Sequence, residues 1–260
     1  RRCGRRLSRA SALARLPISV EVEAAWEPVV SPDGQHILFA GRRGGQIDVA
    51  KVTLQGEELE WLTFHAADDY SPAWSWDGQQ VAWVSERAGR GQVWVMEVGR
   101  EGEVEPRRLP SAYEDRQTRH PAWAPDGTLY LSAIDENGSE ELYQYDPATG
   151  ELAIKTVWPY KATQPAVNAK GEVVFVGWKE NPPWRGLYRL QEDGKNGENQ
   201  EHKLLWETTD WIGNPAWSAD GQWILFTRWH DDGGTNDLWA LPAAGGEPQR
   251  VTSHMAWDAD

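Results

Sequence analysis

The chain has 260 residues, 40% of them hydrophobic and 25% charged, which is an ordinary composition for a globular protein with a sizeable core. No run approaches the roughly 18 consecutive apolar residues that a transmembrane helix needs, so we expect no membrane insertion. The net charge is −14, and an acidic body of this kind repels phosphate backbones, which argues against nucleic-acid binding.

The chain opens with a basic arm, residues 1–10. Six arginines and no acidic residue lie within residues 1–16, and without them the rest of the chain sums to −20. Arginines interrupt the leucines and alanines here, which makes a poor signal peptide. We interpret the arm as a solvated tail, with a processing remnant or a contact for an acidic partner as alternatives. Cys3 is the single cysteine, so no intrachain disulfide or cysteine-based metal site is expected.

A seven-residue box then recurs along the chain. It reads PVVSPDG at 28–34, PAWSWDG at 72–78, PAWAPDG at 121–127, PAVNAKG at 165–171 and PAWSADG at 215–221. The leading prolines are 44, 49, 44 and 50 residues apart. Such a period, without a helical apolar rhythm, is typical of four-stranded propeller blades. We therefore predict an all-β β-propeller over residues 11–260, with blades starting near 28, 72, 121, 165 and 215.

Each repeat predicts four short strands. We expect each box to form the first strand of its repeat. Its proline lies at the start of that strand, where the missing proline N–H removes no hydrogen bond from the sheet. A tight hairpin follows at Asp-Gly, and an apolar run such as 80–84 (QVAWV) forms the second strand. A glycine-containing loop leads to a third strand such as 92–96 (QVWVM), and 59–63 (LEWLT) illustrates the short fourth strand.

The two ends extend the pattern. Residues 11–17 precede the first box at the spacing of a fourth strand, so we expect them to close a blade whose other strands lie elsewhere. Residues 252–260 match residues 63–71, which predicts a further proline-led strand after Asp260. We expect the parent protein to be a six-bladed ring with a composite closing blade. A parent with seven or eight blades is the alternative.

The repeat resembles the TolB-type propeller repeat (WD40-like, PD40). The resemblance rests on the boxes, the apolar strands that follow them, the loop SERAGRGQ at 85–92, the strand VWVMEV at 93–98 and the closing Leu-Thr. The resemblance covers residues 11–260. Similar repeats form the periplasmic TolB propeller, the propellers of prolyl-oligopeptidase-type hydrolases and sensor propellers fused to other modules. The resemblance therefore implies a fold, while function has to be argued from the residues.

Motifs for catalysis or cofactors are missing from the sequence. It contains no GxSxG, HExxH, Walker or GxGxxG pattern, so we expect no catalytic residues in this chain and no cofactor. His65 and His254 share one repeat position, but loops of adjacent blades usually hold such groups ~10 Å or more apart. Acidic pairs such as Asp68-Asp69 lack the spacing of a calcium loop and are interpreted as solvated, so no metal site is predicted.

The Asp-Gly pairs of the boxes are interpreted as structural. An aspartate oxygen can accept local backbone N–H bonds, and glycine tolerates the positive φ of a tight turn. Recurrence in nearly every repeat favours architecture over function. The predicted turn residues are Asp33, Gly34, Asp77, Gly78, Asp126, Gly127, Asp220 and Gly221.

Tryptophan is unusually abundant, with 17 residues. Those on the first, second and third strands, such as Trp74 and Trp83, are assigned to the packing between blades. Other aromatic and charged residues fall in predicted loops that should emerge on one face, and these suit a binding surface. The candidates are Trp158, Trp178, Trp184, Trp211, Trp229, Trp257, Tyr70, Tyr113, Tyr160, Arg87 and Arg185. The alternative is that long loops fold back and bury their own tryptophans.

The first functional hypothesis is a non-catalytic scaffold that holds a protein or peptide partner on this aromatic loop face. The resemblance implies an extracytoplasmic, periplasmic bacterial location. The alternative is a propeller that screens substrates for a larger prolyl-oligopeptidase-type serine hydrolase, and a third option is a sensor propeller behind a DNA-binding module.

Overall fold

The structure is a computed structural model, and it describes residues 22–99, 105–110, 117–134, 137–157, 161–179, 183–191, 202–229 and 236–252. The expected arm at 1–10 and the expected closing strand at 11–17 lie outside these ranges. The described residues form twenty strands in five four-stranded antiparallel sheets. The predicted all-β propeller of four-stranded blades is therefore confirmed, with five blades.

Each blade takes four consecutive strands. Blade 1 contains β1 (Ala24–Val30), β2 (His36–Arg43), β3 (Gln46–Thr53) and β4 (Glu60–Trp61). Blade 2 contains β5 (Asp69–Trp74), β6 (Gln80–Ser85), β7 (Gln92–Glu97) and β8 (Arg107–Arg108). Blade 3 contains β9 (Thr118–Trp123), β10 (Leu129–Ile134), β11 (Glu140–Tyr145) and β12 (Leu152–Ile154).

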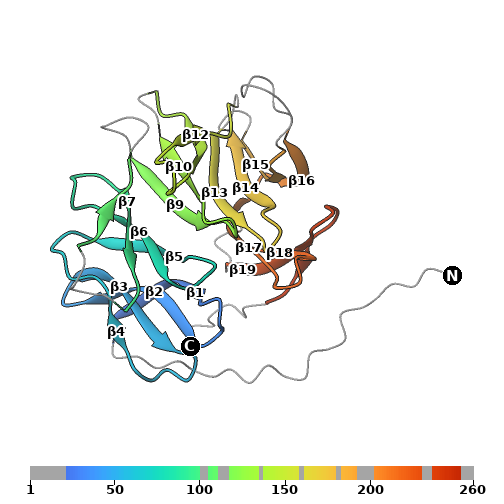
Figure 1. The fold of residues 1–260 in the computed structure, drawn as a ribbon. Coiled ribbons are helices and arrows are strands. Elements are labelled where there is room, and N and C mark those ends of the chain that lie inside the picture. Colours follow the sequence, from blue (N-terminus) through green and yellow to red (C-terminus); the bar gives the residue numbers. More distant parts are fainter. Residues whose placement is uncertain are drawn as a thin grey trace.

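The last two blades continue the series. Blade 4 contains β13 (Lys161–Val167), β14 (Val173–Lys179), β15 (Trp184–Arg189) and β16 (Lys203–Thr208). Blade 5 contains β17 (Trp211–Trp217), β18 (Trp223–Trp229), β19 (Asp237–Pro242) and β20 (Gln249–Arg250). The first strands β1, β5, β9, β13 and β17 contact one another in succession, so the blades follow an arc around a common centre (Figure 1).

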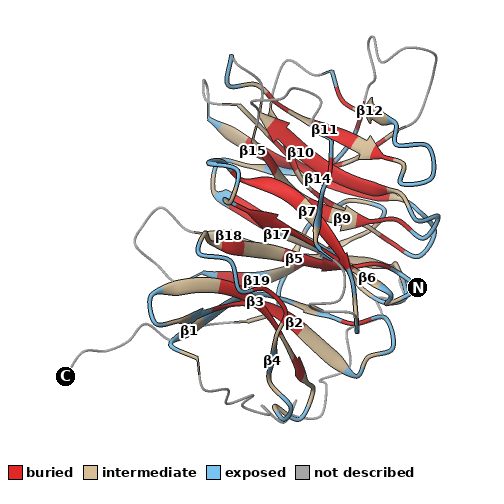
Figure 2. Cartoon of the chain, turned by 60° about the vertical axis from the view of Figure 1, so that its left-hand side comes forward, coloured by how far each residue is buried: buried red, intermediate tan, exposed pale blue. Residues whose placement is uncertain are grey.

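The core lies between the blades rather than inside any one of them (Figure 2). Apolar clusters join blades 1 and 2, 2 and 3, 3 and 4, and 4 and 5. The predicted packing role of the strand tryptophans holds for Trp74, Trp83 and Trp123, which are all buried at these junctions. Blades 2, 3 and 4 thus bury both apolar faces against neighbouring blades, as expected of a repeat architecture.

The boxed prolines do not lie at the start of the first strands, as the sequence had suggested. Each first strand begins three or four residues earlier and continues through the proline. A register shift with the second strand occurs at this point in every blade, as between Tyr70 and Ala73. The irregularity is a β-bulge, where a proline is tolerated because its missing N–H leaves no gap in the ladder.

The residue before each boxed proline has a positive φ. The values are 52° for Glu27, 51° for Ser71, 52° for His120, 53° for Gln164 and 53° for Asn214. A non-glycine residue rarely adopts this conformation, and here it recurs at one repeat position in all five blades. The five residues line a cavity of about 370 Å³ at the centre of the arc.

Two hydrogen-bonded pairs of these residues link neighbouring blades. The Ser71 N–H donates to Glu27 Oε2 at 2.7 Å, and the Ser71 hydroxyl donates to Glu27 Oε1 at 3.0 Å. Between blades 4 and 5, the Asn214 N–H donates to Gln164 Oε1 at 2.6 Å. The bulge takes these N–H groups out of the ladder, and a side chain of the preceding blade satisfies them.

The Asp-Gly hairpins share one hydrogen-bonding scheme. Asp77 Oδ1 accepts the Gln79 N–H at 3.0 Å and the Ser75 hydroxyl at 2.6 Å, while Gly78 has a φ of 70°. Asp33, Asp126 and Asp220 accept the equivalent N–H, and Gly34, Gly127 and Gly221 also have positive φ. These bonds favour the charged carboxylate, and the pKa of Asp77 lies below its usual value, with the Ser75 hydroxyl as the largest cause.

The divergent box at 165–171 reaches the same turn with other residues. Lys170 stands where the other boxes have aspartate, and the acceptor is supplied instead by Asn168, two positions earlier. Asn168 Oδ1 accepts the N–H groups of Lys170 at 2.9 Å and Glu172 at 3.0 Å. An amide oxygen thus replaces the carboxylate.

Removing the turn acceptor is expected to destabilise the fold. Asp77→Ala should lower the free energy of unfolding by about 1 kcal/mol, the net value of such hydrogen bonds. Gly78→Val should lower it by at least ~1–2 kcal/mol, because a β-branched residue opposes positive φ. Thermal melting measures both, with Lys170→Ala as a control that removes no turn acceptor. Unchanged melting of Asp77→Ala would refute the structural role of the aspartate.

The link between blades 1 and 2 is expected to add stability. Glu27→Ala removes the acceptor of two donors and should lower the free energy of unfolding by about 1 kcal/mol, with Glu27→Gln intermediate because it keeps one oxygen. Chemical denaturation measures the change. Glu58→Ala is the matched control, since Glu58 is another exposed glutamate with a positive φ of 57°. Equal loss in Glu58→Ala would show that the effect belongs to the backbone conformation and not to the link.

Candidate functional site

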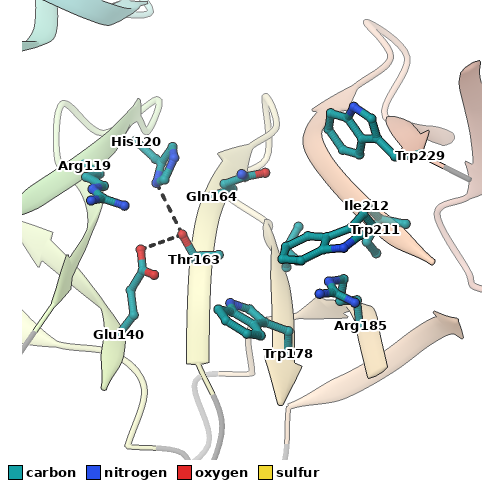
Figure 3. A pocket seen from close by; sticks show the side chains of 11 residues that line it. Arg119, His120, Glu140, Thr163, Gln164, Trp178, Arg185, Trp211, Ile212 and Trp229 are labelled. Carbon is teal, nitrogen blue, oxygen red and sulfur yellow. Dashed lines mark hydrogen bonds between the residues drawn. The ribbon is translucent and has the colours of Figure 1, made fainter. Parts of the chain in front are cut away.

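A pocket of about 740 Å³ opens between blades 3, 4 and 5 (Figure 3). It lies at the end of the blades where second strands finish and third strands begin, and where each new blade starts. Its volume falls within the range of about 300–1,000 Å³ that ligand sites occupy. The lining residues are Arg119, His120, Glu140, Thr163, Gln164, Val176, Trp178, Arg185, Trp211, Ile212 and Trp229.

Three tryptophans form one side of this pocket, and we call Trp178, Trp211 and Trp229 the tryptophan wall. Trp178 lies near the end of β14, while Trp211 and Trp229 are paired across β17 and β18. The ring centroids of Trp178 and Trp211 are 6.1 Å apart with an interplanar angle of 50°. Trp211 is 51% exposed. An exposed, oriented indole next to a cavity is suited to stacking on a ligand.

Arg185 is built into the tryptophan wall. It pairs with Trp178 across β14 and β15, and its guanidinium carbon lies 3.4 Å from the Trp211 ring centroid and 5.7 Å from that of Trp178. The residue is only 6% exposed although it lines the pocket. An Arg185 N–H also donates to the Thr209 carbonyl at 3.4 Å. Stacking on an indole is a geometry that arginine supports and lysine does not.

A glycine allows the tryptophan wall to close over β17. A Cβ atom at Gly213 would lie 3.2 Å from the Trp229 ring and 2.9 Å from Gln164 Oε1. A side chain at this position would therefore push Trp229 and Gln164 apart. Since Gln164 also holds the Asn214 N–H, Gly213 couples the pocket to the link between blades 4 and 5.

The opposite side of the pocket carries a hydrogen-bonded network. Glu140 Oε1 accepts the hydroxyls of Ser132 at 2.8 Å and Thr163 at 2.7 Å. The Nδ1 atom of His120 lies 3.1 Å from the Ser132 hydroxyl and 3.3 Å from that of Thr163. We call His120, Glu140, Thr163 and Ser132 the polar network. It joins blades 3 and 4, because Thr163 belongs to β13 and the other three residues to blade 3.

The histidine of this network is uncharged near neutral pH. Burial lowers the pKa of His120 to about 4, and the neighbouring positive charge of Arg119 contributes. The serine, histidine and glutamate do not form a nucleophile–base–orienter chain, because Glu140 contacts the hydroxyls rather than the imidazole. Ser132 is also fully buried. The network is thus arranged to hold the two blades in register and not to activate a nucleophile.

The structure brings together four of the residues predicted from the sequence. Trp178, Trp211, Trp229 and Arg185 meet in the pocket, although at strand ends rather than in loops. Trp158, Trp257, Tyr113 and Tyr160 lie outside the described residues.

Three other predicted residues lie elsewhere. Trp184 packs between blades 3 and 4 beside Tyr188, with ring centroids 6.0 Å apart. Tyr70 packs between blades 2 and 3. Arg87 binds the buried Asp69 at 3.0 Å and stacks over Trp94, with 4.5 Å to the ring centroid. Their packing stabilises the blades and does not extend the tryptophan wall.

Sequence reasoning missed the polar side of the pocket. Arg119 and His120 directly precede one boxed proline, and Thr163 and Gln164 precede the next. These two repeat positions form the inner edge of each blade. An alignment of the five repeats could therefore have indicated that these residues lie together at the centre of the arc. The part of the chain that the structure describes holds no group of three or more His, Cys, Asp or Glu side chains placed to bind a metal ion. Nor do those residues include a helix with the length and apolar character to cross a membrane.

Comparison with known proteins identifies relatives of this fold. The chain is 24% identical over 196 residues to the uncharacterized peptidase YuxL of Bacillus subtilis, a match that covers 60% of this chain and 29% of YuxL. It is 24% identical over 110 residues to the TolB homolog of Chlorobaculum tepidum, which covers 42% of this chain and 24% of the homolog. The chain thus spans less than a third of the length of these curated relatives.

The fold itself recurs in a solved structure of a putative TolB from Agrobacterium tumefaciens, with a TM-score of 0.71 and 17% identity. That match covers 87% of this chain and 80% of the other. The family model described as the TolB beta propeller domain, PD40, matches residues 13–203. The repeated boxes, the five four-stranded blades and this match agree, and the chain belongs to the PD40 family of TolB β-propeller domains.

Proposed function

We propose that this propeller is a non-catalytic scaffold that holds a protein or peptide partner in the pocket between blades 3, 4 and 5. The observation that carries the proposal is the tryptophan wall, in which an exposed Trp211 lies against the buried guanidinium of Arg185. Tryptophan and arginine are the residue types in which binding energy concentrates at protein interfaces. The names of two relatives, which are TolB proteins, favour a binding role and a periplasmic location.

The rigidity of the site also supports a binding role. The tryptophan wall stands on the ends of paired strands, and the polar network fixes the opposite side. A preorganised surface loses little conformational entropy when a ligand binds. A partner segment that enters the pocket would meet an apolar surface on one side and hydrogen-bonding groups on the other.

Removing Trp211 from the tryptophan wall is expected to weaken binding. Peptides selected from a random library on the full chain should bind Trp211→Ala at least about tenfold more weakly, since a central tryptophan at an interface often contributes 2 kcal/mol or more. Melting should change little, because Trp211 is half exposed. Trp26→Ala is the matched control, as Trp26 is 41% exposed and lies under Arg42, with 5.1 Å from the guanidinium to the ring centroid. Equal affinity for Trp211→Ala and the unchanged chain would refute this site.

A second candidate function is a propeller that screens substrates for a larger serine hydrolase, and the peptidase name of YuxL favours it. A fluorophosphonate probe, which labels reactive serines, applied to the full-length gene product tests this candidate. Labelling that a competing peptide substrate prevents would support it. Absence of labelling, together with the peptide binding described above, would favour the scaffold.

A further inference from the structure

Among the residues that the structure describes, those lining the pocket carry more positive than negative charge, although the chain as a whole is acidic. The chain carries a net charge of −14, yet Arg119 and Arg185 both line the pocket. The Lys161 ammonium lies 4.4 Å from the Trp178 ring centroid, which places a third cation next to the tryptophan wall. Among the described lining residues, Glu140 supplies a single carboxylate. The described lining residues thus give the pocket two guanidinium groups and one carboxylate.

The negative charge of Glu140 is directed into the protein. Its Oε1 atom accepts two hydroxyl bonds within the polar network, and the residue is buried. The neighbouring His120 is neutral, so it neither adds positive charge nor pairs with the glutamate. Arg119 and Arg185 are therefore the cationic side chains that a ligand meets among the described lining residues.

The geometry of Arg185 suits a planar anion. Its guanidinium stacks on Trp211 at 3.4 Å, which fixes the plane of the group. A fixed guanidinium can donate two parallel N–H bonds to a carboxylate, and burial strengthens such charge-assisted bonds. Arg119 lies on the opposite side of the pocket, beyond Thr163 and Gln164, so a ligand that fills the cavity passes between the two cations (Figure 3).

We infer that the pocket recognises a carboxylate of the partner peptide together with a neighbouring aromatic or aliphatic side chain. The carboxylate binds between Arg185 and Arg119, and the apolar side chain stacks on Trp211 and Trp229. The inference rests on the proposed function and specifies its ligand. An aspartate or glutamate side chain and a free C-terminus both supply the group. At physiological salt, charges still repel one another within a Debye length of roughly 8–10 Å. The acidic body therefore disfavours a run of acidic residues close to its surface, and a single carboxylate is favoured.

Two pairs of peptides test this inference. N-acetyl-Ala-Phe-Asp-amide is compared with its Asn counterpart, and N-acetyl-Ala-Phe with a free C-terminus is compared with its amide. Ligand-observed NMR titration against the full chain measures each affinity. At least one carboxylate is expected to bind about tenfold or more tightly than its neutral partner, because hydrogen bonds to a charged group are stronger than those to a neutral one. The preference should fall as salt concentration rises.

Arginine variants locate the effect. Arg119→Gln should remove much of the carboxylate preference, whereas Arg108→Gln, an exposed arginine on β8 of blade 2, should preserve it. Arg185→Lys keeps the charge but loses the planar fork, so the preference should shrink without vanishing. Melting curves verify that each variant folds. A preference for the Asp peptide alone identifies a side-chain ligand, and a preference for the free C-terminus alone identifies a chain end.

The outcomes separate this inference from the proposed function. If charged and neutral peptides bind equally and Trp211→Ala weakens both, the scaffold stands and carboxylate recognition is overturned. If the preference survives Arg119→Gln and Arg185→Lys undiminished, the carboxylate binds elsewhere and the inference also fails. If none of the four peptides binds but library-selected peptides bind and Trp211→Ala weakens them, carboxylate recognition is overturned and the scaffold stands.

Discussion

A four-stranded blade has two apolar faces and no means of burying either alone, and this constraint governs the whole structure. The second strands show it most clearly, since β6 and β14 are buried over nearly their full length. Their side chains point alternately into the clusters on either side, so blades 2, 3 and 4 each depend on two neighbours. The cluster on the outer face of blade 1, around Phe39 and Val52, draws on blade 1 and the segment just before it within the described residues.

A second feature recurs at the centre of the arc, where the first strands meet around a cavity. The bulge at each boxed proline takes one residue out of the ladder and gives it a positive φ. The side chains of Glu27 and Gln164, freed in this way, accept an N–H of the next blade. Architecture and site share this device, since His120 and Gln164 are bulge residues and also line the pocket.

The pocket is asymmetric because its two sides come from different repeat positions. On one side, the inner-edge residues His120 and Thr163 are joined by Ser132 of β10 and Glu140 of β11, and their imidazole, hydroxyl and carboxylate groups bond one another. Positions at the strand ends of blades 4 and 5 provide indoles and a stacked guanidinium. The equivalent ends of blades 1 and 2 use arginine differently: Arg43 and Arg87 bind the buried Asp48 and Asp69 and thereby fasten loops to their own sheets. The same repeat position can therefore hold a structural ion pair in one blade and a binding residue in another.

Much of this protein is determined by local sequence. The box period of 44–50 residues, the Asp-Gly turns and the alternation of apolar residues specify hairpins and blades within short stretches of chain. Even the divergent turn at Asn168 follows from groups two and four residues apart. The number of strands per blade and the role of Trp74, Trp83 and Trp123 in packing could be predicted for this reason.

The pocket, in contrast, forms only in the tertiary structure. Trp178 and Trp211 are 33 positions apart along the chain, and they meet because blade 5 stacks on blade 4. Trp184 and Arg185 are adjacent in sequence, yet strand alternation sends one toward blade 3 and the other toward blade 5. Aromatic content alone could not separate them, since the same residue type packs between blades or lines a cavity depending on which face its neighbour covers. Local sequence thus determines each blade, whereas the site exists only where blades meet.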